Sequence, residues 1–181
     1  MTGKLAAILH SAIEPALALL PSIMDTPSAR VLLLAFGLQE SRFEHRDQLE
    51  KGGKNTALGP ALSFWQFERA GGVLGVLQHK ASRIHAVRIC TARGVNADSR
   101  AVWERMAVDD VLGAAFARLL IWTDPIAMPA PTDTEAAWRL YLRTWRPGAY
   151  ERGTEAQRQE LRAKFNRNHA AAREFVTGAR A

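Results

Sequence analysis

Residues 31–38 (VLLLAFGL) carry no polar side chain on any face. A run of this kind fits either a buried strand or a helix that is enclosed on all sides. Its length together with its flanks, from 28 to 40, favours the helix, and Pro27 is a suitable residue near a helix start. The sequence therefore predicts a fully buried helix over 28–40, capped by Thr26 or Ser28.

Helical spacing or helix-capping residues mark most of the remaining chain. Apolar residues recur at helical spacing over 4–20, where Pro15 should kink or split the helix. The polar and Gly-rich segment 44–63 is typical of a long loop, and no strand ladder is recognised. We therefore predict an all-α fold, with one domain over 1–150 and a charged helical extension over 151–181 that packs on it. Further helices are expected over 71–78, 80–92, 99–106, 108–122, 132–144 and 154–176, the last broken near 166–168.

Composition narrows the classes of protein to which the chain can belong. Apolar residues make up 48 % of the 181 residues, enough for a sizeable core. The single cysteine, Cys90, excludes an internal disulfide and is predicted to be a core residue. The net charge of +6 favours an acidic partner, which could be nucleic acid, anionic lipid or anionic wall polymer. No window reaches the ~20 apolar residues of a membrane span. The histidines show no metal-ligand spacing, so we expect no metal and no cofactor.

A glutamate, Glu40, ends the apolar segment and faces the predicted loop. Burial against Phe36 and Phe43 would disfavour its charged form, and so would the negative end of the helix dipole. Both effects raise the pKa of a carboxyl group. A carboxyl that stays protonated near neutral pH can donate a proton to a glycosidic oxygen. By itself, however, this position also fits an ordinary surface residue at a helix end.

Three motifs in order resemble those of the soluble lytic transglycosylases in the lysozyme-like superfamily. Residues 40–43 (ESRF) match their Glu-Ser-x-Phe motif. Residues 63–66 (SFWQ) approximate Gly-Leu-Met-Gln, with only Gln66 identical and a longer gap before it. Residues 141–148 (YLRTWRPG) supply the Pro-Gly of the third motif without its Tyr-Asn pair. The resemblance spans about residues 28–150, and its divergence is typical of phage lysozyme-like proteins.

The resemblance implies a lysozyme-like helical domain that cleaves the β-1,4 bond between N-acetylmuramic acid and N-acetylglucosamine in peptidoglycan. Glu40 would act as the general acid and then as the general base. Ser41 would orient Glu40 or the substrate, and Tyr141 would take the place of the family tyrosine beside the glutamate. The two tryptophans, Trp65 and Trp145, either stack on sugar rings or pack in the core. The residues expected to contact the glycan are Ser41, Trp65, Gln66, Tyr141 and Trp145.

The substrate groove is expected between the Glu40 helix and the segment 52–66. Both hydrolysis and the anhydro-forming reaction of the transglycosylases stay open, because only hydrolases of the usual kind need a second carboxylate. Glu44 would share a face with Glu40 if the helix continued another turn. The candidates for a second acid are Glu44, Asp47, Glu50 and Glu68.

Two other functions fit the sequence. An inactive structural or adaptor protein of a virion would explain the absent Tyr-Asn pair. A nucleic-acid-binding protein would use the basic segment 80–88 and the basic tail. For the enzyme, Glu14 interrupts the apolar N-terminal stretch, so no secretory signal is assigned. We expect synthesis in the bacterial cytoplasm and action in the periplasm or wall, reached through a holin, a virion or another route.

Overall fold

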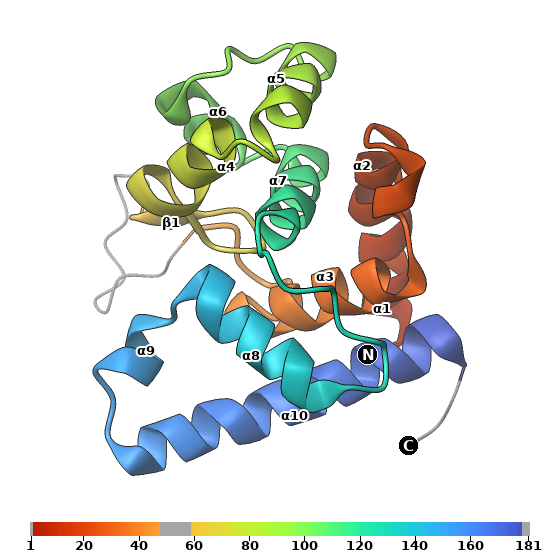
Figure 1. Ribbon diagram of the computed structural model, residues 1–181, viewed down its shortest axis with the longest axis vertical. Coiled ribbons are helices and arrows are strands. Elements are labelled where there is room, and N and C mark those ends of the chain that lie inside the picture. The colour runs from red at the N-terminus through yellow and green to blue at the C-terminus, as the bar shows by residue number, and fades with distance from the viewer. Residues whose placement is uncertain (1, 48–58, 179–181) are drawn as a thin grey trace.

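The computed structural model describes residues 2–47 and 59–178, and it confirms an all-α fold. Helices account for nearly all the regular structure of these residues, and one two-stranded sheet completes it (Figure 1). The helical segments are α1 (Thr2–Ile8), the π-helical turn η1 (Leu9–Ile13), α2 (Glu14–Ala18), the 3₁₀ turn η2 (Ser22–Met24), α3 (Pro27–Glu40), the π-helical turn η3 (Arg69–Val73), α4 (Leu74–Gln78), α5 (Arg83–Ala92), α6 (Ser99–Arg105), α7 (Asp110–Trp122), α8 (Thr134–Trp145), α9 (Gly148–Glu151) and α10 (Glu155–Thr177).

Helix α3 forms the centre of the fold, as its uniformly apolar sequence predicts. Every residue over 31–38 is buried, and the helix contacts η1, α7 and α10. Thr26 caps its start by accepting a hydrogen bond from the Ala29 N–H at 3.1 Å. The side chain of Cys90 on α5 is also buried, so its predicted place in the core is confirmed.

Pro15 changes the helix type near the N-terminus instead of breaking the chain into separate helices. It lies in the first turn of α2, directly after the π-helical turn η1. Because proline has no N–H, the preceding turn lacks one hydrogen bond and can widen. The predicted irregularity at Pro15 therefore takes the form of a π turn between α1 and α2.

Helix α3 ends without a glycine cap because the following residues turn back on it. Arg42 and Phe43 both have a φ of 55°, in the left-handed region. This turn folds the Phe43 ring over Gly37, where a Cβ atom would overlap the ring. The absence of a side chain at Gly37 therefore leaves space for the Phe43 ring.

Gly37→Ala is expected to lower the free energy of unfolding by about 1–3 kcal/mol, because the new methyl group overpacks against Phe43. Gly75→Ala in α4 is the matched control, since a Cβ atom at Gly75 would have no neighbouring atom within 4 Å. That change should instead stabilise the protein by roughly 0.5–1 kcal/mol. Urea denaturation of both variants measures the difference, and a neutral Gly37→Ala would contradict the packing argument.

A short hairpin that the sequence did not indicate replaces part of the predicted loop. Strand β1 (Ala61–Leu62) pairs antiparallel with β2 (Phe67–Glu68), with Leu62 opposite Phe67. Strands of two residues are too short to show the alternation that identifies a strand in a sequence. The remainder of the predicted loop includes 48–58, which lie outside the described residues.

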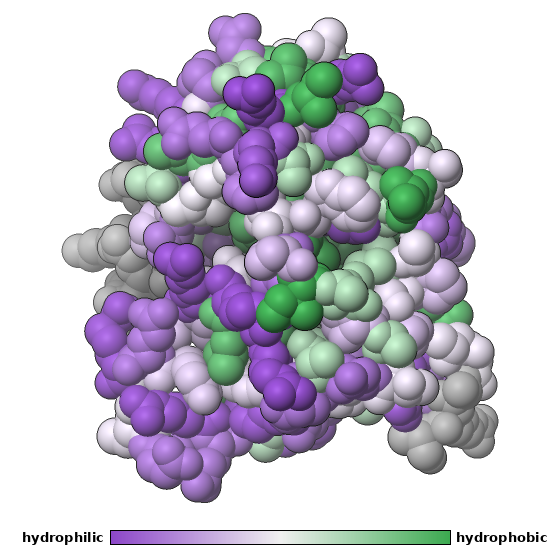
Figure 2. Space-filling view, in the orientation of Figure 1, coloured by the Kyte–Doolittle hydropathy of each residue, from purple (hydrophilic) through white to green (hydrophobic). Residues whose placement is uncertain are grey.

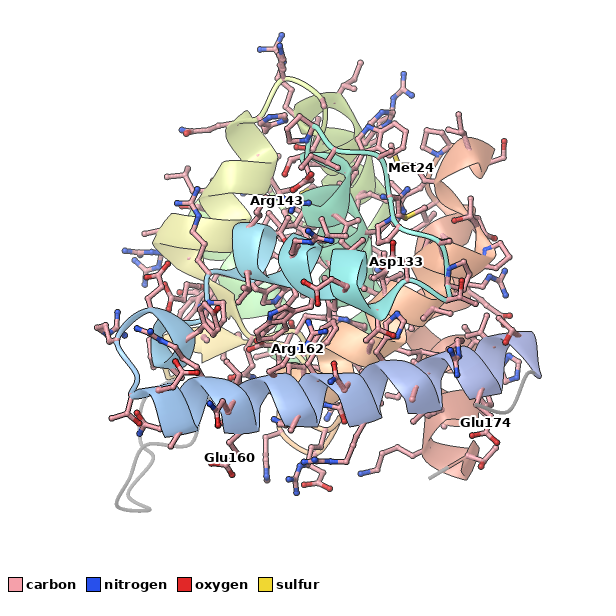
Figure 3. The ribbon with its side chains drawn as sticks, turned by 60° about the horizontal axis from the view of Figure 1, so that its bottom comes forward. Met24, Asp133, Arg143, Glu160, Arg162 and Glu174 are labelled. Atoms are coloured by element: carbon pink, nitrogen blue, oxygen red, sulfur yellow. The ribbon has the colours of Figure 1, made fainter. Side chains whose placement is uncertain are left out.

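The predicted break in the C-terminal segment near 166–168 was also wrong. Helix α10 is continuous and lies along α3 and α8 (Figures 1 and 3). It starts with a capping box between Thr154 and Gln157. Phe165 and His169 face the core one turn apart, and Asn168 donates a hydrogen bond to the Gln39 side chain at 2.8 Å. These tertiary contacts offset the weak helix propensity of the asparagines.

Across the described ranges, no helix has the length and hydropathy needed to cross a membrane. The face shown in Figure 2 is largely hydrophilic, and its hydrophobic residues form separate small patches.

Candidate active site

A groove of about 1210 Å³ runs past the end of α3. One wall comes from β2, η3 and α4, and the other from α8 and α9, which lie opposite them in Figure 1. Ala61 and Gln66 line it, in agreement with the predicted position beside the segment 52–66. Tyr141 and Trp145, which the sequence predicted to contact the glycan, line the α8 part of that wall, whereas the sequence did not indicate α9. Polar groove residues to which the sequence assigned no role include His45, Asp124 and Arg143.

Glu40 is the last residue of α3 and lines this groove, with its side chain partly exposed. The Tyr141 hydroxyl donates a hydrogen bond to Glu40 Oε1 at 2.5 Å. Burial raises the pKa of Glu40 from 4.5 to about 7, although the Tyr141 hydrogen bond and the charge of Lys164 lower it. The carboxyl group can therefore hold a proton near neutral pH, by the burial effect that the sequence suggested.

Tyr141 is held in place by a cluster of aromatic rings. Only 2 % of the residue is exposed, and its ring lies 5.3 Å from that of Phe36 and 5.4 Å from that of Phe165. Burial and the neighbouring Glu40 carboxylate raise the pKa of the Tyr141 hydroxyl far above its usual value. Tyr141 therefore keeps its proton near neutral pH and donates it in the hydrogen bond to Glu40.

Helix α10 also reaches the end of α3, through polar contacts that the sequence did not reveal. Lys164 Nζ donates to the Gln39 backbone carbonyl at 2.5 Å, next to Glu40 in the chain. The Gln39 side chain is buried and accepts the hydrogen bond from Asn168. A cation at the C-terminal end of a helix is favourable, because it faces the negative end of the helix dipole. Lys164 thus stabilises the helix end and the Glu40 carboxylate together.

Two residues predicted to contact substrate have structural roles, although Ser41 also lines the groove. Ser41 Oγ donates to the Phe64 carbonyl at 2.7 Å and accepts from the Phe43 N–H, so it joins the hairpin turn to α3. Because these contacts engage the hydroxyl away from Glu40, its predicted role of orienting Glu40 is not supported. Trp65 is 0 % exposed, and its Nε1 donates to the Leu33 carbonyl at 2.9 Å. The prediction that Trp65 stacks on a sugar was wrong, because its indole fills the core.

Gln66 and Trp145 do line the groove and are partly exposed. Gln66 adopts a φ of 52°, and its Nε2 donates to the Ser63 carbonyl at 2.8 Å. Trp145 Nε1 donates to the Trp65 carbonyl at 2.9 Å, which links α8 to the hairpin turn. The side chains of both residues are therefore fixed in place at the groove surface, where a ligand can contact them.

The candidates for a second acid separate into two groups. Glu44 is exposed, forms an ion pair with Lys4 at 3.2 Å and is absent from the groove lining. The condition for placing it on the same face as Glu40 is not met, because the chain turns after Ser41, and Glu44 is a solvated charge. Asp47 and Glu68 line the groove, whereas Glu50 lies outside the described residues.

In the parts of the chain that the structure describes, no three or more histidine, cysteine or acidic side chains gather as a metal site would require. No family model, curated protein or solved structure matches the chain.

Tyr141→Phe is expected to raise the pKa of Glu40 above about 7, because it removes the hydrogen bond that lowers it. NMR titration of the Glu40 side-chain carboxyl measures this shift. Tyr150→Phe is the matched control, since Tyr150 is the other tyrosine of the chain and does not line the groove. An unchanged titration in Tyr141→Phe would contradict the arrangement described above.

Proposed function

We propose that this protein is a peptidoglycan-cleaving enzyme of the lysozyme-like type, with Glu40 as its acid. The observation that carries the proposal is a partly buried carboxyl group with a pKa of about 7, held by Tyr141 in a long groove. The motif resemblance supports the same function, since Tyr141 stands where the family tyrosine is expected. The bond cleaved is the β-1,4 linkage between N-acetylmuramic acid and N-acetylglucosamine.

The arrangement suits proton transfer to a glycosidic oxygen. The Tyr141 O–H donates a hydrogen bond to Oε1 of Glu40, so the proton for the glycosidic oxygen is carried by the other carboxyl oxygen, Oε2. As the C–O bond breaks, the proton moves to the leaving oxygen and Glu40 becomes a carboxylate. Tyr141 and Lys164 both favour this charged form. The groove is larger than the ~300–1,000 Å³ typical of small-molecule sites, as a polymer strand requires.

The second half of the reaction has two chemical forms. In hydrolysis, the Glu40 carboxylate accepts a proton from water, whose oxygen bonds to the sugar and leaves a reducing end. Asp47 or Glu68 would then serve as a second carboxylate. In the transglycosylase reaction, Glu40 accepts the proton of a sugar hydroxyl, whose oxygen closes a 1,6-anhydro ring.

Digestion of purified peptidoglycan, with products identified by mass spectrometry, tests the proposal. Wild type should release muropeptides and Glu40→Gln should not. Reducing ends among the products would assign a hydrolase, and anhydro ends a transglycosylase. If wild type released nothing from several wall types, an inactive virion component would replace the enzyme as the favoured function. Steeply salt-dependent binding to generic DNA would instead favour the nucleic-acid-binding alternative.

The proposed place of action is the periplasm or cell wall, with delivery by a holin or within a phage particle. Cytoplasmic expression in bacteria should then be harmless until a holin is co-expressed, and lysis should follow. Turbidity measurements with wild type and Glu40→Gln check this expectation.

A further inference from the structure

A second pocket of about 510 Å³ adjoins the groove beside Glu40. The two share one wall, formed by α9 and the first half of α10. Arg42, two residues after Glu40 in the turn that follows α3, also lines the second pocket. The groove and this pocket are therefore neighbouring cavities with part of their lining in common. The shared lining residues are Gly148, Ala149, Arg152 and Leu161.

The second pocket is strongly basic. Its lining includes four cationic side chains and one acid, Glu160, which projects from the edge of α10 in Figure 3. Within 2–47 and 59–178, none of the four cations forms an ion pair with an acid, whereas Arg143 elsewhere pairs with Asp124 at 2.8 Å. The cations are Arg42, Arg152, Lys164 and Arg167.

Repulsion within this pocket makes the binding of an anion favourable. Burial lowers the pKa of the Lys164 amine, the charge of Glu40 opposes this shift, and the charge of Arg42 adds to it. Lys164 donates its hydrogen bond to the neutral Gln39 carbonyl and forms no ion pair within 4.0 Å among the described residues, although its charge also acts on Glu40. An incoming anion would relieve the repulsion between Arg42 and Lys164.

Arg152 lies at the junction of the pocket and the groove. Its guanidinium group packs directly over Gly148, where a Cβ atom would overlap it. Glycine at this position therefore lets the guanidinium reach the wall that both cavities share. The planar fork of an arginine suits carboxylates in particular, because it can donate two parallel hydrogen bonds.

We propose that this basic pocket binds the carboxylates of the peptide that branches from the glycan strand, while the strand itself lies in the groove. The inference rests on the proposed function. The sugars of such a strand carry no charge that requires four cations, whereas its peptide branches end in free carboxylates. The pocket would thus make the enzyme selective for peptide-bearing strands over bare glycan.

A binding experiment with inactive protein tests the pocket separately from catalysis. In a Glu40→Gln background, we would add Arg42→Gln and Arg167→Gln together and measure co-sedimentation with peptidoglycan. The same measurement uses glycan strands stripped of peptide by an amidase, with the muramic acid carboxylates that this cleavage frees converted to neutral methylamides. Binding to peptide-bearing strands should weaken about tenfold or more, and binding to bare strands should not change.

Arg83→Gln with Arg88→Gln in the same background is the matched control. It removes the same two charges from exposed positions on α5, far from the pocket (Figure 1). An equal loss in this control, an equal loss on bare strands, or no loss at all would each overturn the proposal. A loss confined to binding of a duplex oligonucleotide would also overturn it, in favour of a nucleic-acid site. If wild type cleaved no wall but the peptide-selective loss remained, only the catalytic proposal would fail.

Discussion

Glu40→Gln is expected to slow peptidoglycan cleavage by on the order of 10²–10⁴-fold while leaving the protein folded. Glutamine can still accept the hydrogen bond from Tyr141, but it has no acidic proton to donate. The loss should therefore appear in kcat and not in strand binding. Initial rates of muropeptide release, measured at saturating peptidoglycan for wild type and variant, check this expectation.

The pH dependence of the wild type follows from the raised pKa of Glu40. The acid form predominates below about pH 7, so the rate of the proton-donating step should fall as pH rises through that value. The free energy of unfolding should also fall as pH rises, because the folded state holds the proton of Glu40 more tightly than the unfolded state does. The stabilisation of the folded state by protonated Glu40 is fully present below the unfolded pKa of 4.5 and is lost as pH rises through about 7.

Glu40→Gln should remove the part of the pH-dependent stability that comes from Glu40, because the amide stays neutral where the carboxyl group would lose its proton. At pH 8 the variant should have a higher free energy of unfolding than wild type, and the difference should shrink toward pH 4.5. Glu44→Gln is the control, since Glu44 is exposed and outside the groove lining. A variant Glu40→Gln with wild-type cleavage rates would exclude Glu40 as the acid.

Phe36→Ala is expected to lower the free energy of unfolding by about 3–5 kcal/mol. The ring of Phe36 is completely buried in α3. It contacts the rings of Tyr141, Trp145 and Phe165, at 5.3, 4.9 and 6.0 Å between centroids. Its removal leaves a cavity where α3, α8 and α10 meet. Urea denaturation monitored by circular dichroism measures the effect.

The matched control for this prediction is Ile84→Ala on α5, where the side chain is 55 % exposed. Its effect should stay within about 0.5 kcal/mol. Phe36→Leu tests the link from core to site in a protein that remains folded, because Tyr141 packs on this ring. The titration midpoint of Glu40 should shift in Phe36→Leu. An unchanged midpoint, or a Phe36→Ala protein as stable as wild type, would contradict this role of the ring.

The sequence by itself indicated the longer helices, although it predicted α5, α7 and α8 to start two or three residues too early and did not indicate α9. Asp98 caps α6 by accepting from the Ala101 N–H, and Asp109 caps α7 by accepting from the Leu112 N–H. Such signals are readable because a cap and the turn that it closes lie within four residues of each other. The apolar run of α3 likewise required a central position, since every face of that helix had to be buried.

The sequence also singled out Glu40 as a candidate, because burial at the end of an apolar helix would raise the pKa of a carboxyl group. It did not decide which neighbours would act on that carboxyl. Tyr141 reaches Glu40 from α8, and Lys164 reaches the same helix end from α10. These contacts join distant parts of the chain, and no local pattern encodes them.

The directions in which the two tryptophans of the motif regions point also could not be predicted from local sequence. Trp65 faces the core and Trp145 faces the groove, although either was compatible with stacking on a sugar. The left-handed residues Ser63 and Gln66 on either side of Trp65 set the direction of its side chain. Sequence determined the residue types and the helices that carry them. The tertiary structure alone decided which side chains face the groove, because that depends on how α3, α8 and α10 pack together.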